Sequence, residues 1–173
     1  MKQSIRVFAI SMMAMFFIAE NASAQKDKST RPSPPAQATA KIGDATVTID
    51  YSQPSKKGRE VFGGIVPYGE VWRTGANEAA WIEVSADVTI GGKTLSKGKY
   101  GLFTVPGEKE WEVIFNKTWD QWGAYNYSKA DDVLRIKAKA STTDATEQFT
   151  ISISDGGTVT MAWDTTKAEF QIK

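Results

Sequence analysis

The chain has 173 residues, with 21 lysines and arginines against 20 aspartates and glutamates, and it contains neither histidine nor cysteine. The near-zero net charge argues against nucleic acid or an anionic membrane as the main partner. Without histidine and cysteine there can be no Ser-His-Asp or Cys-His catalysis, no ordinary zinc, copper or haem site and no disulfide, so we predict no catalytic residue, no metal and no cofactor.

The first 24 residues have the features of a secretory signal peptide. Lys2 and Arg6 begin the chain, an apolar stretch covers 7–19, and Ala22-Ser23-Ala24 supplies the small residues that a signal peptidase recognises. The apolar stretch is shorter than the roughly 20 residues of a membrane span, although a retained membrane anchor is the alternative. We therefore expect an exported protein, periplasmic or extracellular, with no membrane span after cleavage.

Residues 25–36 are polar and rich in proline, which predicts an extended tether, with 31–35 laid along the domain. The remainder, 37–173, is long enough for a single domain with its own core. It alternates apolar and polar residues between frequent turns. This pattern predicts an all-β fold, an antiparallel β-sandwich or partly open barrel of about nine or ten short strands. The expected strands are 38–42, 46–51, 81–90, 94–95, 100–105, 111–115, 133–140, 149–153, 159–163 and 168–172.

Two long irregular loops interrupt the strand pattern, and loops carry function in such folds. The first, 53–79, is rich in glycine and contains Trp72, Arg73, Asn77 and Glu78. A guanidinium beside an amide and a carboxylate can recognise a carboxylate or sugar hydroxyls. The alternative is structural: the loop covers one end of the domain, and Arg73 pairs with Glu70 or Glu78.

The second loop, 116–131, is rich in aromatic residues. Its rings could stack on sugars or apolar ligands, with amides beside them to donate hydrogen bonds, or they could only fill the domain. Its candidate ligand-binding residues are Asn116, Gln121, Trp122 and Tyr125.

Counting chain reversals predicts where the two loops lie. If 94–95 is a full strand, both loops reach the same end of the domain. We count it as one, because Gly91-Gly92 and 96–98 are separate turn signals. Arg73 and Asn77 are then expected to lie near Trp122 and Tyr125, in one composite pocket.

Four stretches resemble the secreted domain-of-unknown-function family 2911. They are RPSPPA (31–36), IDYSQPSKKGREVFGGIVPYGEVWRTGANEA (49–79), GKYGLFTVPGEKEWEVIFNK (98–117) and QWGAYNY (121–127). The resemblance implies a β-rich domain behind an export signal, and it brings no established activity, substrate or catalytic residue.

Three functional hypotheses follow. The first is a non-catalytic binding or accessory module of the cell envelope, for a glycan or small polar ligand. The second is a carboxylate-dependent hydrolase, with Glu78 as general base and Arg73 stabilising negative charge; it requires both side chains to line one open cleft, with Glu78 outside a closed ion pair. The third is a purely structural envelope domain. Nothing in the sequence indicates an oligomeric state.

Overall fold

The computed structural model describes residues 28–173, so the predicted signal peptide and the start of the predicted tether lie outside it. Nine strands and two short 3-10 helices make up the regular structure, and the described residues contain no α-helix. Their bounds are η1 Lys28–Thr30, β1 Pro35–Ile42, β2 Ala45–Ser52, β3 Trp81–Val84, β4 Val88–Ile90, β5 Lys93–Leu95, β6 Gly98–Val105, β7 Glu110–Asn116, η2 Lys129–Asp131, β8 Asp132–Ile153 and β9 Thr158–Gln171.

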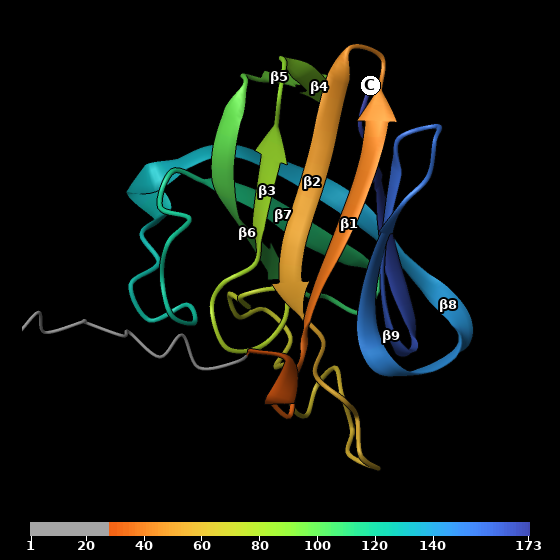
Figure 1. Ribbon diagram of the computed structural model, residues 1–173. Helices are drawn as coiled ribbons and strands as arrows, with labels where there is room; N and C mark the ends of the chain where they lie inside the picture. The colour runs from red at the N-terminus through yellow and green to blue at the C-terminus, as the bar shows by residue number, and fades with distance from the viewer. Residues whose placement is uncertain (1–27) are drawn as a thin grey trace, which may run out of the picture.

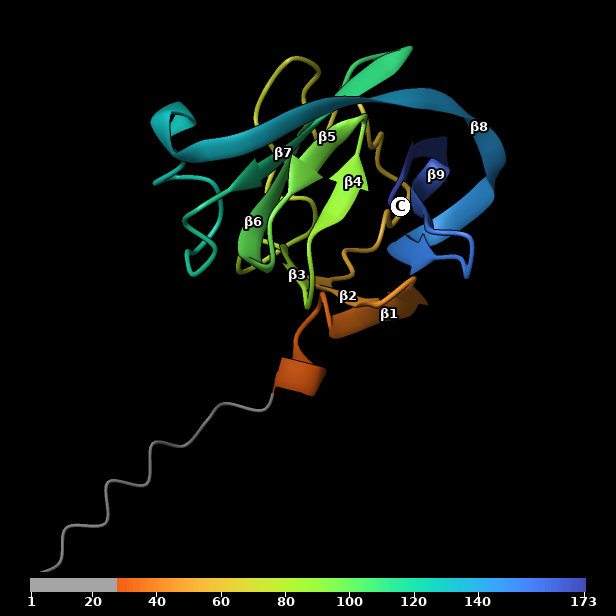
Figure 2. The same cartoon turned by 90° about the horizontal axis from the view of Figure 1, so that it is seen from above.

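Seven strands form one antiparallel sheet in the order β1-β2-β3-β6-β7-β8-β9, and β4 and β5 form a separate two-stranded sheet. Seen from above, β8 arches from β7 around to β9, which brings the second half of β8 close to β1 and β2 (Figure 2). The Tyr51 hydroxyl bonds both the N–H and the C=O of Ile151, and Ser55 bridges Gln148. The predicted all-β antiparallel fold is confirmed, as a curled sheet that fits a partly open barrel.

The concave side of the curled sheet holds the core. Alternating residues of each strand point inward, as the period-two pattern requires. An aromatic cluster fills one end, with the Trp72 and Trp163 rings stacked at 6.1 Å and Phe62 4.9 Å from Trp111. This cluster consists of Phe62, Trp72, Trp111, Phe149 and Trp163.

Two expected pairs of short strands are single long ones. β8 runs through residues 141–148, which are mostly polar and mostly exposed, and its pairing with β9 shifts register between Thr142 and Thr150. β9 likewise continues through Asp164, which has a φ of 54°. Bulges of this kind carry a strand through residues that do not alternate, so the pattern there predicted a break.

The expected strand over 81–90 is two strands in different sheets. Ser85 bonds Thr46 through both its N–H and its hydroxyl oxygen, and the Asp87 carboxylate accepts from the Lys97 N–H. The Ser85 and Asp87 side chains thus take backbone N–H groups that would otherwise be free to form ladder bonds, and β3 ends at Val84. β4 then pairs with the end of the chain, where Ile90 bridges Ile172.

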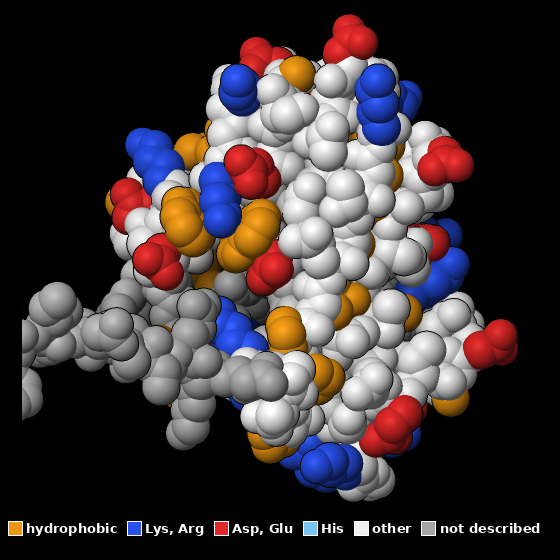
Figure 3. All heavy atoms as spheres, in the orientation of Figure 1, with side chains coloured by type: hydrophobic (Ala, Val, Ile, Leu, Met, Phe, Trp, Pro, Cys, Tyr) orange, Lys and Arg blue, Asp and Glu red, His pale blue; other side chains and the backbone are white. Residues whose placement is uncertain are grey.

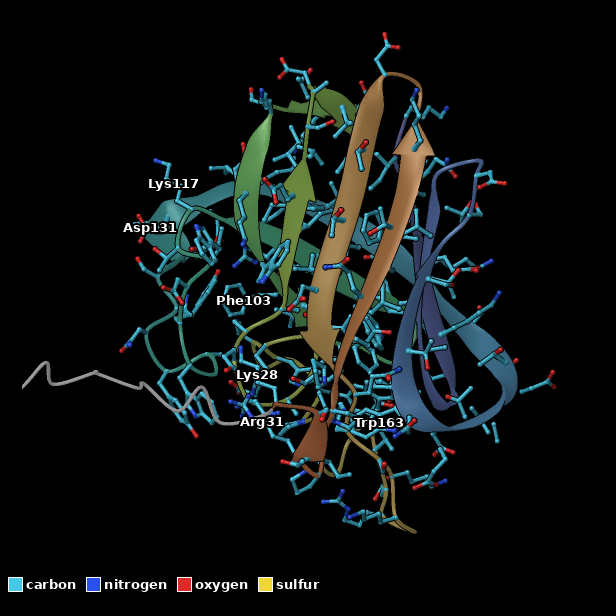
Figure 4. All side chains as sticks on the ribbon, viewed as in Figure 1. Lys28, Arg31, Phe103, Lys117, Asp131 and Trp163 are labelled. Atoms are coloured by element: carbon cyan, nitrogen blue, oxygen red, sulfur yellow. The ribbon has the colours of Figure 1, made fainter. Side chains whose placement is uncertain are left out.

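The chain before β1 is docked on the domain. β1 begins at Pro35, inside the range predicted as a tether. The Pro34 carbonyl accepts from the Gln53 N–H, and the Ser33 carbonyl accepts from the Asn77 amide. The expectation that 31–35 lies along the domain therefore agrees with the structure. Lys28 and Arg31 lie together below the ends of β1 and β2 (Figure 4).

Candidate functional site

The two irregular loops meet at one end of the curled sheet; in Figure 1 the first hangs below the sheet and the second lies at its left. Glu78 bridges Trp122, the Ala79 N–H donates to the Gln121 carbonyl at 2.9 Å, and the Gly123 N–H donates to the Asn77 carbonyl at 3.1 Å. These contacts form a short ribbon of residues 77–79 and 121–123. The prediction that the loops share an end is confirmed.

The reasoning behind that prediction was wrong. The segment 94–95 belongs to the separate β4–β5 sheet, and β6 pairs antiparallel with β3. The loops meet because the strands are staggered: Trp81, Gly101 and Asn116 lie at the same level of the sheet. β6 continues past that level to Val105, and β7 returns to it, so the second loop starts beside the end of the first.

The first loop has a strained backbone that its buried contacts hold in place. Thr74 and Asn77 have φ values of 54° and 61°, in the left-handed region that a β-branched residue rarely adopts. The Thr74 hydroxyl is fully buried and lies 3.1 Å from that of Thr104, and the Trp72 N–H donates to the Thr104 carbonyl. The loop is therefore held in place, with Arg73 carried between two anchored residues.

Arg73 is half-buried at the junction of the loops. Its Nη1 donates to the Asn77 carbonyl at 3.0 Å, and a Cβ added to Gly123 would lie 3.3 Å from the same nitrogen. Among the ion pairs of residues 28–173, none includes Arg73. The structural hypothesis that it pairs with Glu70 or Glu78 is wrong, and most of its five N–H donors have no acceptor within the described chain.

Two adjoining hollows lie along Arg73, and we call them together the Arg73 groove. Ile65, Val66, Trp72 and Arg73 line both hollows. Tyr125 lines one hollow, while Asn77 and Trp122 line the other. Trp122 is 54% exposed and Tyr125 is 80% exposed, so both aromatic side chains are accessible beside the guanidinium.

Glu78 turns away from this groove. Its carboxylate pairs with Arg31 at 2.7 Å and with Lys28 at 3.2 Å. Burial alone would raise the pKa of Glu78, but hydrogen bonds from its own backbone N–H, from Arg31 and from Lys28 hold that pKa below its ordinary value. A general base needs a raised pKa and an open cleft shared with Arg73, so the hydrolase hypothesis in this form does not meet its own condition.

Glu78 lines a second cavity of about 190 Å³, which we call the Trp119 pocket. Its walls combine carboxylates, a buried amide and two indole rings. The lining residues include Lys28, Asp50, Glu78, Trp81, Trp119, Asp120 and Gln121. Burial raises the pKa of Asp50, against the opposing effects of Lys28, a hydrogen bond with Gln37, and Lys99.

The remaining candidates divide between support and lining. Asn116 is fully buried and donates to the Ser128 carbonyl and the Asp132 carboxylate, so it shapes the second loop and lines neither the Arg73 groove nor the Trp119 pocket. The second loop leaves the sheet at Lys117 and rejoins it at Asp131, and these two residues lie side by side (Figure 4). The Lys117 N–H donates a hydrogen bond of 2.9 Å to the Asp131 carbonyl. Gln121 lines the Trp119 pocket instead of the groove.

Sequence reasoning missed Asp50, Trp81 and Trp119 as lining residues. Alternation does place Asp50 and Trp81 on the outer face of neighbouring strands, where they pair directly, Asp50 opposite Trp81. Their shared place on the outer face was the sequence signal that could have identified both as lining residues. Trp119 reaches the same face only because Gly101 has no side chain, since a Cβ there would lie 2.7 Å from the Thr118 carbonyl oxygen.

Within residues 28–173, no three carboxylates are grouped so that they could hold a metal ion. No helix in this part of the chain has the length and apolar character of a membrane span.

The fold and loops define a β-rich domain with one curled antiparallel sheet and two joined loops at one end. The chain belongs to the family described as "Protein of unknown function (DUF2911)", whose model matches residues 33–172. The predicted family is thereby confirmed. Comparisons with curated proteins and with solved structures found no match.

Proposed function

We propose that this protein is a non-catalytic binding module whose Arg73 groove takes a glycan or another small polar ligand. The observation that carries the proposal is the state of Arg73: a half-buried guanidinium with one hydrogen bond, to the Asn77 carbonyl, in a groove with accessible aromatic rings. A fixed guanidinium with free donors suits a carboxylate, which it can bind with two parallel hydrogen bonds.

The aromatic side chains supply the second half of the recognition. Trp122 and Tyr125 present exposed rings on either part of the groove, and flat rings of this kind stack on the apolar faces of sugars. A ligand that combines a sugar ring with a carboxylate would use both features. An acidic oligosaccharide is therefore the expected ligand class.

Placement outside the cytoplasm is part of the same proposal. It rests on the signal-peptide pattern of the first 24 residues. N-terminal sequencing of the exported chain tests it, since cleavage after Ala24 leaves Gln25 as the first residue. A first residue of Met1 would contradict it.

A calorimetric titration with paired oligosaccharides tests the groove. Oligosaccharides containing a uronic acid are compared with the neutral sugars of the same linkage. We expect saturable binding of the acidic member and binding at least about tenfold weaker for the neutral one, because a hydrogen bond between two charged groups contributes about 1.5–3 kcal/mol.

Variants locate the binding. Arg73→Gln is expected to abolish the preference for the acidic sugar, and Arg73→Lys to restore only part of it, because lysine lacks the planar fork. Lys41→Gln, which removes one charge from an exposed position at the far end of β1, serves as the control. Equal binding of acidic and neutral sugars, no binding of either, or an unchanged Arg73→Gln variant would overturn the proposal and favour the structural hypothesis.

A further inference from the structure

The Trp119 pocket is a second, separate cavity with a different chemistry from the Arg73 groove. The ribbon of residues 77–79 and 121–123 contributes to both, but with different residues: Glu78, Ala79 and Gln121 line the pocket, whereas Asn77 and Trp122 line the groove. Neither Arg73 nor Tyr125 reaches the pocket. The two cavities can therefore be tested independently.

Two indole rings form one wall of this pocket and already hold a cation. The Lys99 ammonium lies 3.5 Å from the centre of the Trp81 ring and 3.8 Å from that of Trp119. Figure 3 shows basic and hydrophobic side chains gathered over β3 and β6, with acidic side chains beside them. Ring faces attract cations, and here that attraction holds Lys99 in place between the two rings.

The hydrogen-bond acceptors of the pocket favour a ligand that carries a donor. Gln121 is 8% exposed; its Nε2 donates to the Thr118 carbonyl at 3.0 Å, and its buried Oε1 accepts no hydrogen bond from the described residues. A buried acceptor without a donor is destabilising and is rare in folded proteins. The Nε2 bond fixes the amide of this lining residue and leaves its oxygen without a donor from the described residues.

The carboxylates of the pocket are unequal. Glu78 is neutralised by Lys28 and Arg31. Asp50 and Asp120 form no ion pair with any described residue, and Lys99 is held between the rings. Asp50 and Asp120 thus lie outside any ion pair, although Asp50 has a hydrogen bond with Gln37 and interacts with the charges of Lys28 and Lys99. The amide oxygen of Gln121 has no donor among the described residues.

We propose that the Trp119 pocket binds the protonated amino group of a small ligand such as an amino sugar. Asp50 supplies the countercharge, Gln121 Oε1 accepts one N–H, and Trp119 packs on the body of the ligand. The cavity of about 190 Å³ is smaller than the 300–1,000 Å³ of sites for drug-sized ligands, so the occupant is about the size of a monosaccharide.

The experiment compares three monosaccharides that differ at one position. Glucosamine carries an ammonium group at C2, N-acetylglucosamine an uncharged acetamide and glucose a hydroxyl. Titrations are followed by the indole N–H signals in two-dimensional NMR, which report weak binding at each tryptophan. We expect saturable shifts with glucosamine, centred on Trp81 and Trp119, and binding at least about tenfold weaker for the other two, as a charge-assisted bond of about 1.5–3 kcal/mol requires.

Matched variants assign the countercharge. Asp50→Asn is expected to lose glucosamine binding, whereas Asp44→Asn, the same change in the exposed turn between β1 and β2, is expected to retain it. A second variant, Trp119→Phe, is expected to weaken binding and keep the preference for the amine. Circular dichroism confirms that each variant is folded. Arg73→Gln is expected to leave glucosamine binding unchanged, which separates this site from the groove.

Three results would overturn the proposal. They are comparable binding of glucose or N-acetylglucosamine, the absence of any saturable shift with glucosamine, and glucosamine binding that survives in folded Asp50→Asn. The first would indicate hydroxyl recognition without charge, and the third would place the amine elsewhere on the chain.

Discussion

At the scale of single residues, two arginines illustrate opposite uses of the same side chain. Arg135 bonds Asp132 at 2.7 Å, Glu112 at 2.6 Å and the Tyr127 hydroxyl at 2.6 Å, so it closes a network that holds the second loop. Arg73 has one bond to a carbonyl and no ionic partner among the described residues. Arg135 therefore contributes to stability, and Arg73 is available for a ligand.

Alanine substitutions at these two arginines should differ in their cost. Arg135→Ala removes the ionic partner of Asp132, whose side chain is only 8% exposed but keeps its hydrogen bonds from Asn116 and Tyr127, so we expect a loss of about 1.5–3 kcal/mol of unfolding free energy. Arg73→Ala removes one hydrogen bond and should cost about 1 kcal/mol. Urea denaturation measures both. A loss at Arg73 equal to that at Arg135 would show that Arg73 has a structural role after all.

These two roles could not be separated from the sequence. Both arginines stand near carboxylates along the chain, Arg73 near Glu70 and Glu78, and Arg135 near Asp132. Which carboxylate meets which guanidinium depends on side-chain direction and on distant segments. Glu78 illustrates this, because its partners Lys28 and Arg31 come from the segment before β1. Arg31 lies 47 residues before Glu78 in the sequence.

At the scale of elements, the stagger of β3, β6 and β7 builds both candidate cavities. β6 passes the level of Trp81 at Gly101 and continues to Val105, and the first loop adds a bridge from Trp72 to Thr104 on that extension. The second loop folds back over Gly101 and brings Trp119 onto the outer face of the sheet. The close approach depends on the missing side chain at this glycine.

Gly101→Ala tests that dependence. An added Cβ would lie 2.7 Å from the Thr118 carbonyl oxygen and 2.9 Å from the Phe103 ring, so the second loop must shift. We expect a loss of about 1–3 kcal/mol in unfolding free energy and separation of Trp119 from Lys99. Urea denaturation and the Trp119 indole NMR signal measure these effects.

Gly156→Ala is the control for that substitution. Its added Cβ would meet only the Ser154 hydroxyl oxygen at 3.8 Å, an ordinary contact. A Gly101→Ala variant as stable as this control, with an unshifted Trp119 signal, would mean that the loop does not rest on Gly101.

At the scale of the whole molecule, the closure of the curled sheet holds the domain together without disulfides. The aromatic cluster occupies the concave side, and residues from the first loop, β7, β8 and β9 meet in it. Phe62 and Trp72 belong to the first loop, so the same loop that forms the Arg73 groove also plugs the core. The structural hypothesis of a loop that closes one end thus describes its inner face, and the binding hypothesis concerns its outer face.

Two tryptophans from different layers should respond differently to truncation. Trp163 is 1% exposed within the cluster, so Trp163→Ala should cost about 3–5 kcal/mol through lost contacts and an internal cavity. Trp119 is 37% exposed and stacks on Lys99, so Trp119→Ala should cost about 1 kcal/mol or less. Urea denaturation compares the two. Similar losses for both would contradict the assignment of Trp119 to a surface pocket.

Period-two alternation and turn residues were enough to predict the all-β fold, the positions of most strands and the two irregular loops, because they act over a few neighbouring positions. The grouping of Arg73 and Asn77 with Trp122 and Tyr125 was predicted from a wrong strand count, and the stagger of the strands is what brings the two loops together. The three-dimensional structure was needed to show that β8 and β9 are continuous, that 81–90 divides between two sheets, that Glu78 pairs with Lys28 and Arg31, and that Asp50, Trp81 and Trp119 line a second pocket. These features depend on strand register, bulges and pairs distant in sequence, and local patterns carry no information about which distant residues share a level of the sheet.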